Sequence, residues 1–275
     1  MLVTPEEIDH LLAEDLGTGD LTAMIVPTET RATAHVLTRE QMVICGQTWF
    51  DAVFTRLDPN VRIDWLVNEG DEVSAETVLC SLHGGARELL TGERTALNLL
   101  QTLSGTATLA RAYARAVEGT GAQVLDTRKT IPGLRRAQKY AVRCGGCHNH
   151  RMGLYDGILI KENHILAAGS VEDAVRAAHS LGADVPVEVE VENLDEMRQA
   201  LAAGADSLLL DNFSLAMMRE AVSINGGRAK LEVSGNVTLE NIRRIAETGV
   251  DYISVGALTK HVHAIDLSMR ITLIG

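Results

Sequence analysis

Residues 185–212 decide the fold, and they read VPVEVEVENLDEMRQALAAGADSLLLDN. An apolar run alternating with glutamate is typical of a strand, and residues 207–210 form a second apolar run. Between them, apolar residues recur at helical spacing, with Asn193 as a suitable N-cap and Gly204 where the helix should end. The stretch therefore predicts one strand–helix–strand unit.

The same unit recurs along the C-terminal half. Apolar runs predict strands at 122–125, 157–160, 185–191, 207–210, 229–233 and 252–255, and amphipathic stretches predict helices at 171–180, 194–203, 215–223 and 239–248. The last four strands recur about every 22 residues, which predicts right-handed βαβ units in a parallel sheet. Six or seven strands fit either an α/β barrel short of the usual eight or an open doubly wound sheet.

The first hundred residues have a different pattern. Strands predicted at 31–37, 61–67 and 78–82 indicate a small antiparallel α/β domain. A long helix over 88–117 follows, and we expect Gly105 to mark a break within it.

These patterns give the domain organisation. We place the N-terminal domain at residues 1–104 and the domain of strand–helix units at 105–264, and we expect the apolar tail, 265–275, to pack back on the first domain. The turn at 69–71, Glu-Gly-Asp, is also typical of lipoyl and biotinyl carrier modules. Residues 57–90 contain no lysine to modify, which disfavours a carrier function.

Composition limits the class of protein. The chain has 275 residues, 46% of them hydrophobic, and a formal net charge of −12, which indicates a soluble globular protein. The acidic start does not fit a signal peptide, and no apolar run approaches the roughly 18 residues that span a bilayer. We therefore expect a cytoplasmic protein without a membrane partner, in which the four cysteines remain thiols.

One segment of this acidic chain is strongly basic. Residues 127–155 carry seven Lys or Arg and no Asp or Glu, against 18 basic and 37 acidic residues elsewhere. The basic residues are Arg128, Lys129, Arg135, Arg136, Lys139, Arg143 and Arg151. Because the positive charge is local, it predicts a site for a small polyanion rather than for nucleic acid or a membrane; a solvated basic face is the alternative.

The same segment contains Cys144-Gly-Gly-Cys147-His148, a pattern shared with haem c attachment, zinc and redox sites. Haem attachment would need export. A zinc site of Cys144, Cys147, His148 and His150 would crowd four ligands into seven residues. A glycine loop that contains thiols is the favoured interpretation.

Polar residues follow each strand of the predicted barrel, at the rim where parallel α/β folds bind ligands. Glu190 and Asp211 are hard oxygen ligands suited to Mg²⁺, directly or through water. Backbone N–H groups of Ser234-Gly235-Asn236 and of Gly256-Ala257 suit a phosphate. The arrangement suits a reaction that joins an anionic small molecule to a phosphosugar.

A cationic pocket for the carboxylate-bearing ligand is expected beside this phosphate cradle, from Arg128, Lys129, His150, Arg151 and Lys161. Lys161 is expected to anchor a ligand electrostatically, with proton transfer as an alternative. A purely structural ion pair between Lys161 and Glu190 is a further alternative.

The ordered blocks of the chain resemble the quinolinate phosphoribosyltransferase family, the decarboxylating nicotinate-nucleotide pyrophosphorylases of NAD biosynthesis. The blocks are GERTALN (92–98), DTRKTIPGLR (126–135), KYAV (139–142), NHR (149–151), LIKENH (159–164), EVE (188–190), LDN (210–212), SG (234–235) and SVGALT (254–259). The resemblance covers nearly the whole chain. One departure is Cys147, where a third glycine is expected.

The resemblance implies an N-terminal α/β sandwich joined to an incomplete, about seven-stranded α/β barrel, in a homodimer with active sites between subunits. It implies that Arg94 reaches quinolinate from the partner subunit, beside Arg128, His150 and Arg151. Lys129 and Lys161 would lie between quinolinate and phosphoribosyl pyrophosphate. Further implied ligand-binding positions are Thr127, Glu190 and Asp211 (the last two near ribose and Mg²⁺), and Ser234, Gly235, Asn236 and Gly256 around the 5′-phosphate.

The implied reaction joins the quinolinate nitrogen to the anomeric carbon as pyrophosphate leaves, and loss of the 2-carboxylate then gives nicotinate mononucleotide. The pyridinium nitrogen accepts the electrons released by decarboxylation, so Mg²⁺ but no organic cofactor is expected. A paralogue with another acceptor is the main alternative, and Arg94, Arg128, His150 and Arg151 count against it because they suit a dicarboxylate.

Overall fold

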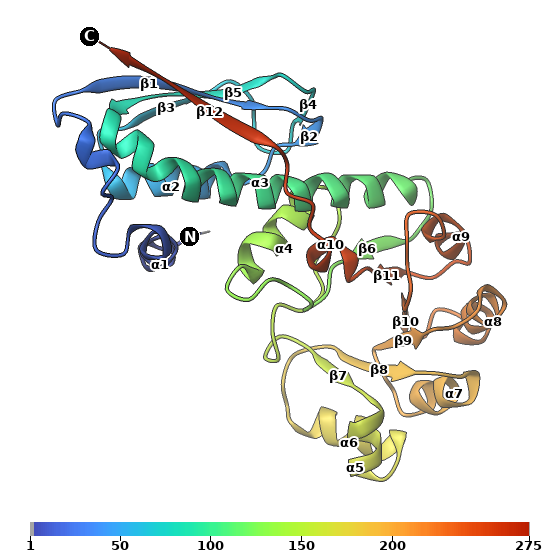
Figure 1. The fold of residues 1–275 in the computed structure, drawn as a ribbon. Coiled ribbons are helices and arrows are strands. Elements are labelled where there is room, and N and C mark those ends of the chain that lie inside the picture. Colours follow the sequence, from blue (N-terminus) through green and yellow to red (C-terminus); the bar gives the residue numbers. More distant parts are fainter. Residues whose placement is uncertain (1–2, 275) are drawn as a thin grey trace. The chain divides into compact units, whose positions relative to one another are not determined.

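The computed structural model describes residues 3–274, and the chain divides into two compact units (Figure 1). The first unit contains the chain up to Ala110, residues 136–145 and the chain from His261 onward. The second contains residues 111–135 and 146–260. Among the described residues, no helix is long and apolar enough to cross a membrane.

The first unit is built on a four-stranded antiparallel sheet in the order β12-β1-β5-β3. Its strands are β1 (Arg31–Thr38), β3 (Arg62–Trp65), β5 (Val78–Gly85) and β12 (Leu267–Ile274). Alternate residues of β1 are buried, which gives the sheet one apolar face. The C-terminal tail forms β12, an edge strand paired with β1 along its whole length.

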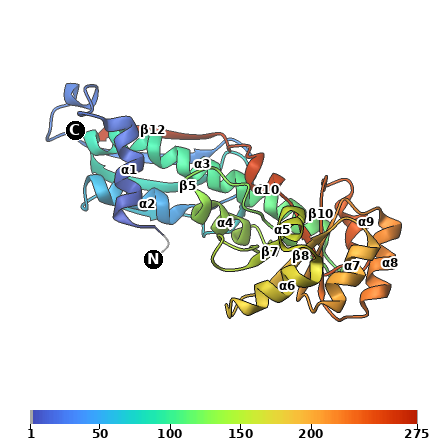
Figure 2. The same cartoon turned by 90° about the horizontal axis from the view of Figure 1, so that it is seen from below.

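Helices α2 (Gln47–Leu57) and α3 (Ala86–Ala116) cover that face, as Figures 1 and 2 both show. The core between them contains Phe50 and Phe54, whose rings lie 5.1 Å apart between centroids. The N-terminal helix α1 (Pro5–Leu16) begins with a capping box of Thr4 and Glu7.

Short elements complete the first unit. They are the 3₁₀ turn η1 (Ala23–Ile25), the two-stranded ladder of β2 (Met42–Val43) and β4 (Glu72–Val73), and α4 (Arg135–Cys144). The sequence did not predict α4, since its few apolar positions are small. The helix contains much of the basic segment, and it packs through the buried side chains of Ala137, Ala141 and Val142.

The expected break at Gly105 is wrong, because α3 continues through it to Ala116. A Cβ atom at Gly105 would lie 2.0 Å from the carbonyl oxygen of His263. Gly105 therefore serves the close approach of the C-terminal segment to the helix, rather than a change of backbone direction.

The second unit contains a six-stranded parallel sheet in the order β6-β11-β10-β9-β8-β7. Its strands are β6 (Gln123–Leu125), β7 (Ile158–Ile160), β8 (Val187–Val191), β9 (Ser207–Asp211), β10 (Lys230–Ser234) and β11 (Tyr252–Ser254). An isolated parallel bridge between Leu125 and His148 adds a further pairing at the outer edge of β6. The incomplete α/β barrel predicted from the sequence is confirmed.

Helices alternate with these strands, and α6 to α9 follow one another along the outside of the sheet (Figure 1). They are α5 (Glu162–Ala168), α6 (Val171–Ser180), α7 (Leu194–Ala202), α8 (Leu215–Asn225), α9 (Ile242–Ala246) and α10 (Ala257–Lys260). Asn193, the N-cap expected from the sequence, accepts hydrogen bonds from backbone N–H groups of the first turn of α7, and Ser170 and Ser214 cap α6 and α8 in the same way. The helix expected over 239–248 is shorter than predicted, because residues 238–241 form turns.

Candidate active site

The strand register of the second unit places a set of polar side chains on one face of the sheet. Glu190 is level with Leu209 on β9, which is level with Glu232 on β10. Two residues further along these strands, Asp211 is level with Ser234. Because side chains alternate between faces, these residues point to the same side, and Asp211 and Ser234 lie at the C-terminal rim.

A buried histidine–carboxylate cluster lies below that rim. The Nε2 atom of His150 is 3.1 Å from Oε2 of Glu188 and 3.4 Å from Oε2 of Glu232. The two glutamates are only 6% and 3% exposed. The fully buried Asp126 accepts a hydrogen bond from the backbone N–H of His150, at 2.9 Å, and another from the Asn149 side chain. Two strands and the loop after α4 thus fix the imidazole.

Burial and the neighbouring charge of Glu188 together raise the pKa of Glu232 to about 8, although His150 opposes the shift. A carboxyl group with this pKa is largely protonated at neutral pH. The cluster can therefore hold a proton between Glu232 and His150, and an anion bound nearby would change where that proton resides.

Lys161 directly follows β7 and pairs with Glu190 of β8 through its Nζ atom. The Lys161 side chain is 48% exposed, so the pair lies at the open rim rather than inside the sheet. Partial exposure lets the ammonium group exchange this carboxylate for an anionic ligand. The structure therefore contains the ion pair that the sequence offered as an alternative, in a position that also suits ligand binding.

The next two strand ends form a hydrogen-bonded group. Asp211 accepts hydrogen bonds from Ser234 Oγ at 2.7 Å and from Asn212 Nδ2 at 2.9 Å. Gly235 has φ +95°, and a Cβ atom there would lie 2.2 Å from Asn212 Oδ1. Asn236 adopts φ +49°. This tight, left-handed turn leaves Gly235 and Asn236 exposed at the rim, where backbone N–H groups can meet an anion.

The ends of β6 and β11 meet in a similar close approach. A Cβ atom at Gly256 would lie 3.1 Å from Cδ of Lys129 and 3.7 Å from Oγ1 of Thr127. The backbone carbonyl of Lys129 accepts a hydrogen bond from Thr259 Oγ1 at 2.9 Å. Gly256 thus leaves room for the Lys129 side chain, which is exposed.

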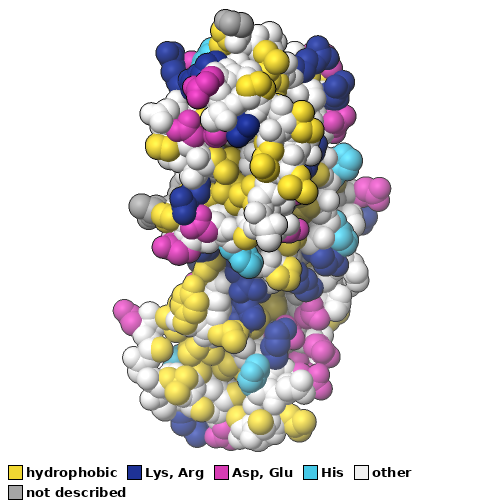
Figure 3. Space-filling view, turned by 60° about the vertical axis from the view of Figure 1, so that its left-hand side comes forward, with side chains coloured by type: hydrophobic (Ala, Val, Ile, Leu, Met, Phe, Trp, Pro, Cys, Tyr) yellow, Lys and Arg dark blue, Asp and Glu magenta, His cyan; other side chains and the backbone are white. Residues whose placement is uncertain are grey.

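Two guanidinium groups lie close enough to repel one another. Burial lowers the pKa of Arg151, and the positive charge of Arg128 lowers it further. Arg151 Nη1 donates to the carbonyl of Gly157 at 3.0 Å, which fixes the side chain. A bound carboxylate or phosphate would relieve the repulsion, so this pair favours an anionic ligand. Figure 3 shows Lys and Arg side chains gathered on one face.

The second unit thus contains all but one of the predicted site residues. The exception is Arg94, an exposed residue of α3 in the first unit. Sequence reasoning did not assign site roles to Asp126, Glu188 and Glu232. A signal was present, since Glu188 and Glu232 interrupt apolar strands at the alternation that points them to one face.

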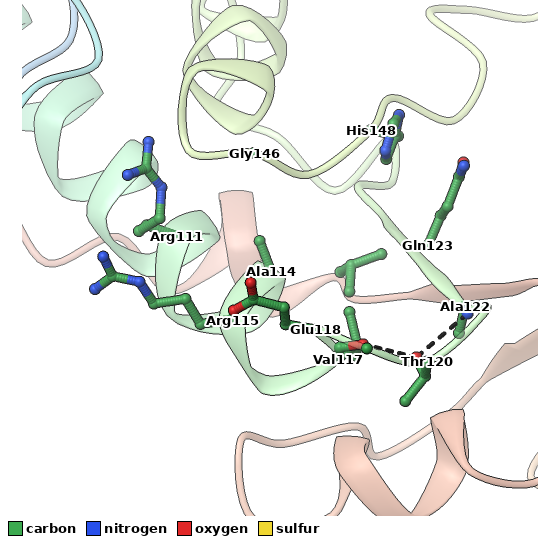
Figure 4. A pocket seen from close by; sticks show the side chains of 12 residues that line it. Arg111, Ala114, Arg115, Val117, Glu118, Thr120, Ala122, Gln123, Gly146 and His148 are labelled. Atoms are coloured by element: carbon green, nitrogen blue, oxygen red, sulfur yellow. Dashed lines mark hydrogen bonds between the residues drawn. The ribbon is translucent and has the colours of Figure 1, made fainter.

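A separate hollow of about 420 Å³ lies in the second unit. Figure 4 shows Arg111, Arg115 and Glu118 around it, with His148 and Gln123 on another side. Its lining includes residues that precede β6, and none of the predicted site residues line it. The strand-end site therefore does not coincide with this hollow.

Comparison with known proteins identifies the family of this chain. The chain matches the models of the quinolinate phosphoribosyl transferase N-terminal domain over residues 20–104 and of its C-terminal domain over residues 106–270. It belongs to the quinolinate phosphoribosyl transferase family.

The relatives and solved structures that the chain matches include several nicotinate-nucleotide pyrophosphorylases. A probable nicotinate-nucleotide pyrophosphorylase [carboxylating] of Bacillus subtilis is 42% identical over 267 residues, which cover 97% of this chain and 92% of the relative. The solved nicotinate-nucleotide pyrophosphorylase of Francisella tularensis is 50% identical, with a TM-score of 0.94 and 98% of each chain covered. That of Ehrlichia chaffeensis is 36% identical, with a TM-score of 0.94 and coverage of 99% of this chain and 100% of the other.

Proposed function

We propose that this protein is a quinolinate phosphoribosyltransferase, a pentosyltransferase of NAD biosynthesis that converts quinolinate and phosphoribosyl pyrophosphate into nicotinate mononucleotide, pyrophosphate and CO₂. Family membership supports the reaction. The observation that carries it to this chain is the pair Arg128 and Arg151, whose mutual repulsion a dicarboxylate would relieve.

In this proposal the basic residues hold the acceptor. Arg128 and Arg151 pair with the quinolinate carboxylates, while the buried carboxylates keep His150 in position for the same ligand. Lys129 follows β6 and Lys161 follows β7, the two edge strands of the sheet, and in this proposal both side chains lie between acceptor and donor. Fixed positive charges lower the barrier by orienting two anions that otherwise repel each other and by stabilising the charge that moves to pyrophosphate.

The other strand ends hold the phosphoribosyl group. The turn at Ser234, Gly235 and Asn236 offers backbone N–H groups to the 5′-phosphate, and Gly256 keeps the neighbouring strand end open. Glu190 and Asp211 come from adjacent strands and point to one face, so their hard oxygen atoms fit a Mg²⁺ ion bound directly or through water. When bound, that ion would neutralise charge on the leaving pyrophosphate.

Release of CO₂ tests this function. The protein is incubated with quinolinate labelled in the 2-carboxylate, phosphoribosyl pyrophosphate and Mg²⁺, beside a reaction with nicotinate as acceptor. Labelled CO₂ that depends on phosphoribosyl pyrophosphate, with no nucleotide formed from nicotinate, would support the proposal. Binding of phosphoribosyl pyrophosphate without CO₂ release would instead indicate the paralogue with another acceptor.

A homodimer with shared sites belongs to the same proposal, because Arg94 lies outside the unit that holds the other site residues. Arg94→Ala and Lys161→Ala variants, each inactive alone, are mixed one to one and allowed to exchange subunits. Half of the dimers would be hybrids with one intact site of two, so about a quarter of the activity should return. No recovery after exchange verified by mass spectrometry would contradict a shared site.

Cytoplasmic location is expected and is tested by fractionation.

A further inference from the structure

The first unit contains a second cluster of metal-ligating side chains, away from the strand ends of the barrel. It consists of Cys45, Glu69 and Cys144, whose ligand atoms all lie within 4.8 Å of one another. The only other such group among residues 3–274 is His150, Glu188 and Glu232 of the candidate active site. The proposed function uses none of the three residues in the first-unit cluster, so they need another explanation.

Cys45 is held in place through its backbone. Its N–H donates to Ser104 Oγ at 3.0 Å, and that hydroxyl donates back to the Cys45 carbonyl at 3.1 Å. Cys45 and Ser104 are both fully buried. The preceding residue, Ile44, pairs through its backbone with Gly70 and Asp71 at 2.9 and 3.0 Å. These bonds join the loop of Cys45 to the turn that carries Glu69.

The Glu69 carboxylate is fixed at the start of α2. Oε1 accepts from the backbone N–H of Gly46 at 2.8 Å, and Oε2 accepts from that of Gln47 at 3.1 Å. The Tyr140 side chain also hydrogen-bonds to this carboxylate. These three bonds orient the group, and because a carboxylate has about four lone-pair positions it can still bind a cation.

Cys144 is the last residue of α4 and brings the third ligand from a distant part of the sequence. Its Sγ lies 3.7 Å from the carbonyl oxygen of Ile44, and a Cβ atom at Gly70 would lie 3.5 Å from that sulfur. Unlike Cys45, it is partly exposed, which gives a cation a path from solvent. The neighbouring Cys147 of the Cys-Gly-Gly-Cys pattern belongs to the second unit.

We propose that Cys45, Cys144 and Glu69 form a binding site for one zinc ion. Sulfur atoms about 2.3 Å from a tetrahedral zinc lie roughly 3.8 Å apart, which fits within the 4.8 Å that encloses these ligand atoms. Two thiolates and one carboxylate form a ligand set that binds zinc more tightly than magnesium, because thiolates are soft ligands. Three protein ligands leave the fourth position to water.

Binding replaces protons by metal. Each of the two thiols loses its proton, the carboxylate binds as the anion, and zinc with these three ligands carries a net charge of about −1. Because protons compete with zinc for the two thiolates, binding should tighten as pH rises. The bound ion would connect the end of α4 to the loop between β2 and α2 and to the loop between β3 and β4, all within the first unit.

The test titrates the full-length protein, reduced and stripped of metal with a chelator, with Cd²⁺, whose thiolate bonds absorb in the ultraviolet. A thiolate-to-cadmium band that saturates at one ion per chain, with release of two protons, is expected. Competition with Zn²⁺ should abolish the band. Because the active-site cluster has no sulfur, this band does not report on that cluster.

Variants locate the site. Cys144→Ser should lose the band, and zinc should raise the melting temperature of the wild type but not of this variant. Cys147→Ser is the matched control and should retain both responses. Glu69→Gln, which keeps the shape of the side chain, should weaken binding while retaining the fold. No band in the wild type, an unchanged band in Cys144→Ser, or a band lost only in Cys147→Ser would overturn the proposal.

Discussion

The sheets of the two units bury different kinds of side chain. In the first unit, β1 directs Ala32, Ala34 and Val36 into an apolar core shared with α2 and α3. In the second, β8 and β10 bury Glu188 and Glu232 beneath a rim of lysine and arginine residues. Buried carboxylates lower stability unless they are paired. The second sheet is therefore less stable than one with apolar side chains at these positions, but it holds groups that can interact with an anionic ligand.

The largest effect is expected from removing a rim cation in the second unit. Lys161→Ala or Arg128→Ala should lower kcat/KM by about 10³-fold or more while the protein stays folded, because each removes a fixed positive charge from the proposed site. Steady-state kinetics and circular dichroism measure the two properties.

Lys230→Ala is the matched control for these variants. Lys230 begins β10 at the opposite end of the sheet and pairs with Asp251 at 2.7 Å, so its loss should leave kcat/KM unchanged. Near-wild-type activity of Lys161→Ala would contradict the placement of Lys161 in the active site.

A change in the first unit should act on stability instead. Gly105→Ala would place a methyl group where the carbonyl of His263 approaches α3, and relieving that overlap should lower the free energy of unfolding by about 2–3 kcal/mol. Chemical denaturation measures the change. Gly121→Ala, with open space around its Cβ position, is the control, and equal effects of the two would contradict the close approach.

Glu232 links stability to pH in the second unit. Its pKa of about 8 in the folded protein lies above the ordinary value of 4.5, so the folded chain keeps a proton that the unfolded chain loses. This contribution is complete below about pH 4.5 and is lost as pH rises to about 8, on the order of 5 kcal/mol. Glu232→Gln should remove that part of the pH dependence. If the free energy of unfolding changes with pH in the same way for the wild type and the variant between pH 4.5 and 8, the role of Glu232 is contradicted.

The smallest effect is expected on the solvent side of the second unit. Arg176 of α6 pairs with Glu172 at 2.6 Å and Asp173 at 2.9 Å, all exposed. Arg176→Ala should lower the free energy of unfolding by only about 0.5 kcal/mol, less in high salt. Denaturation at two salt concentrations tests this, and a loss comparable to that of Gly105→Ala would mean that exposed pairs matter more than the comparison between the units implies.

Sequence patterns predicted an element correctly where its apolar periodicity and its capping residues lie within the element itself. The βαβ repeat was visible because strands and helices of the second unit carry their periodicity and caps locally, as Asn193 and Ser214 show. Most of the rim could be placed for the same reason, since the C-terminal ends of parallel strands meet at one edge. Helix α4 was missed because its packing comes from small side chains such as Ala137 and Ala141.

The sequence by itself determined the order and type of most elements and the strand ends where charged residues gather, because these follow from spacing, capping and alternation. Only the tertiary structure decided that Gly105 lies inside a continuous helix, that His150 joins Glu188 and Glu232, and that Cys144 meets Cys45 and Glu69. In each case the partner lies far away in the sequence. No local periodicity can encode such a contact, which exists only when the chain folds back on itself.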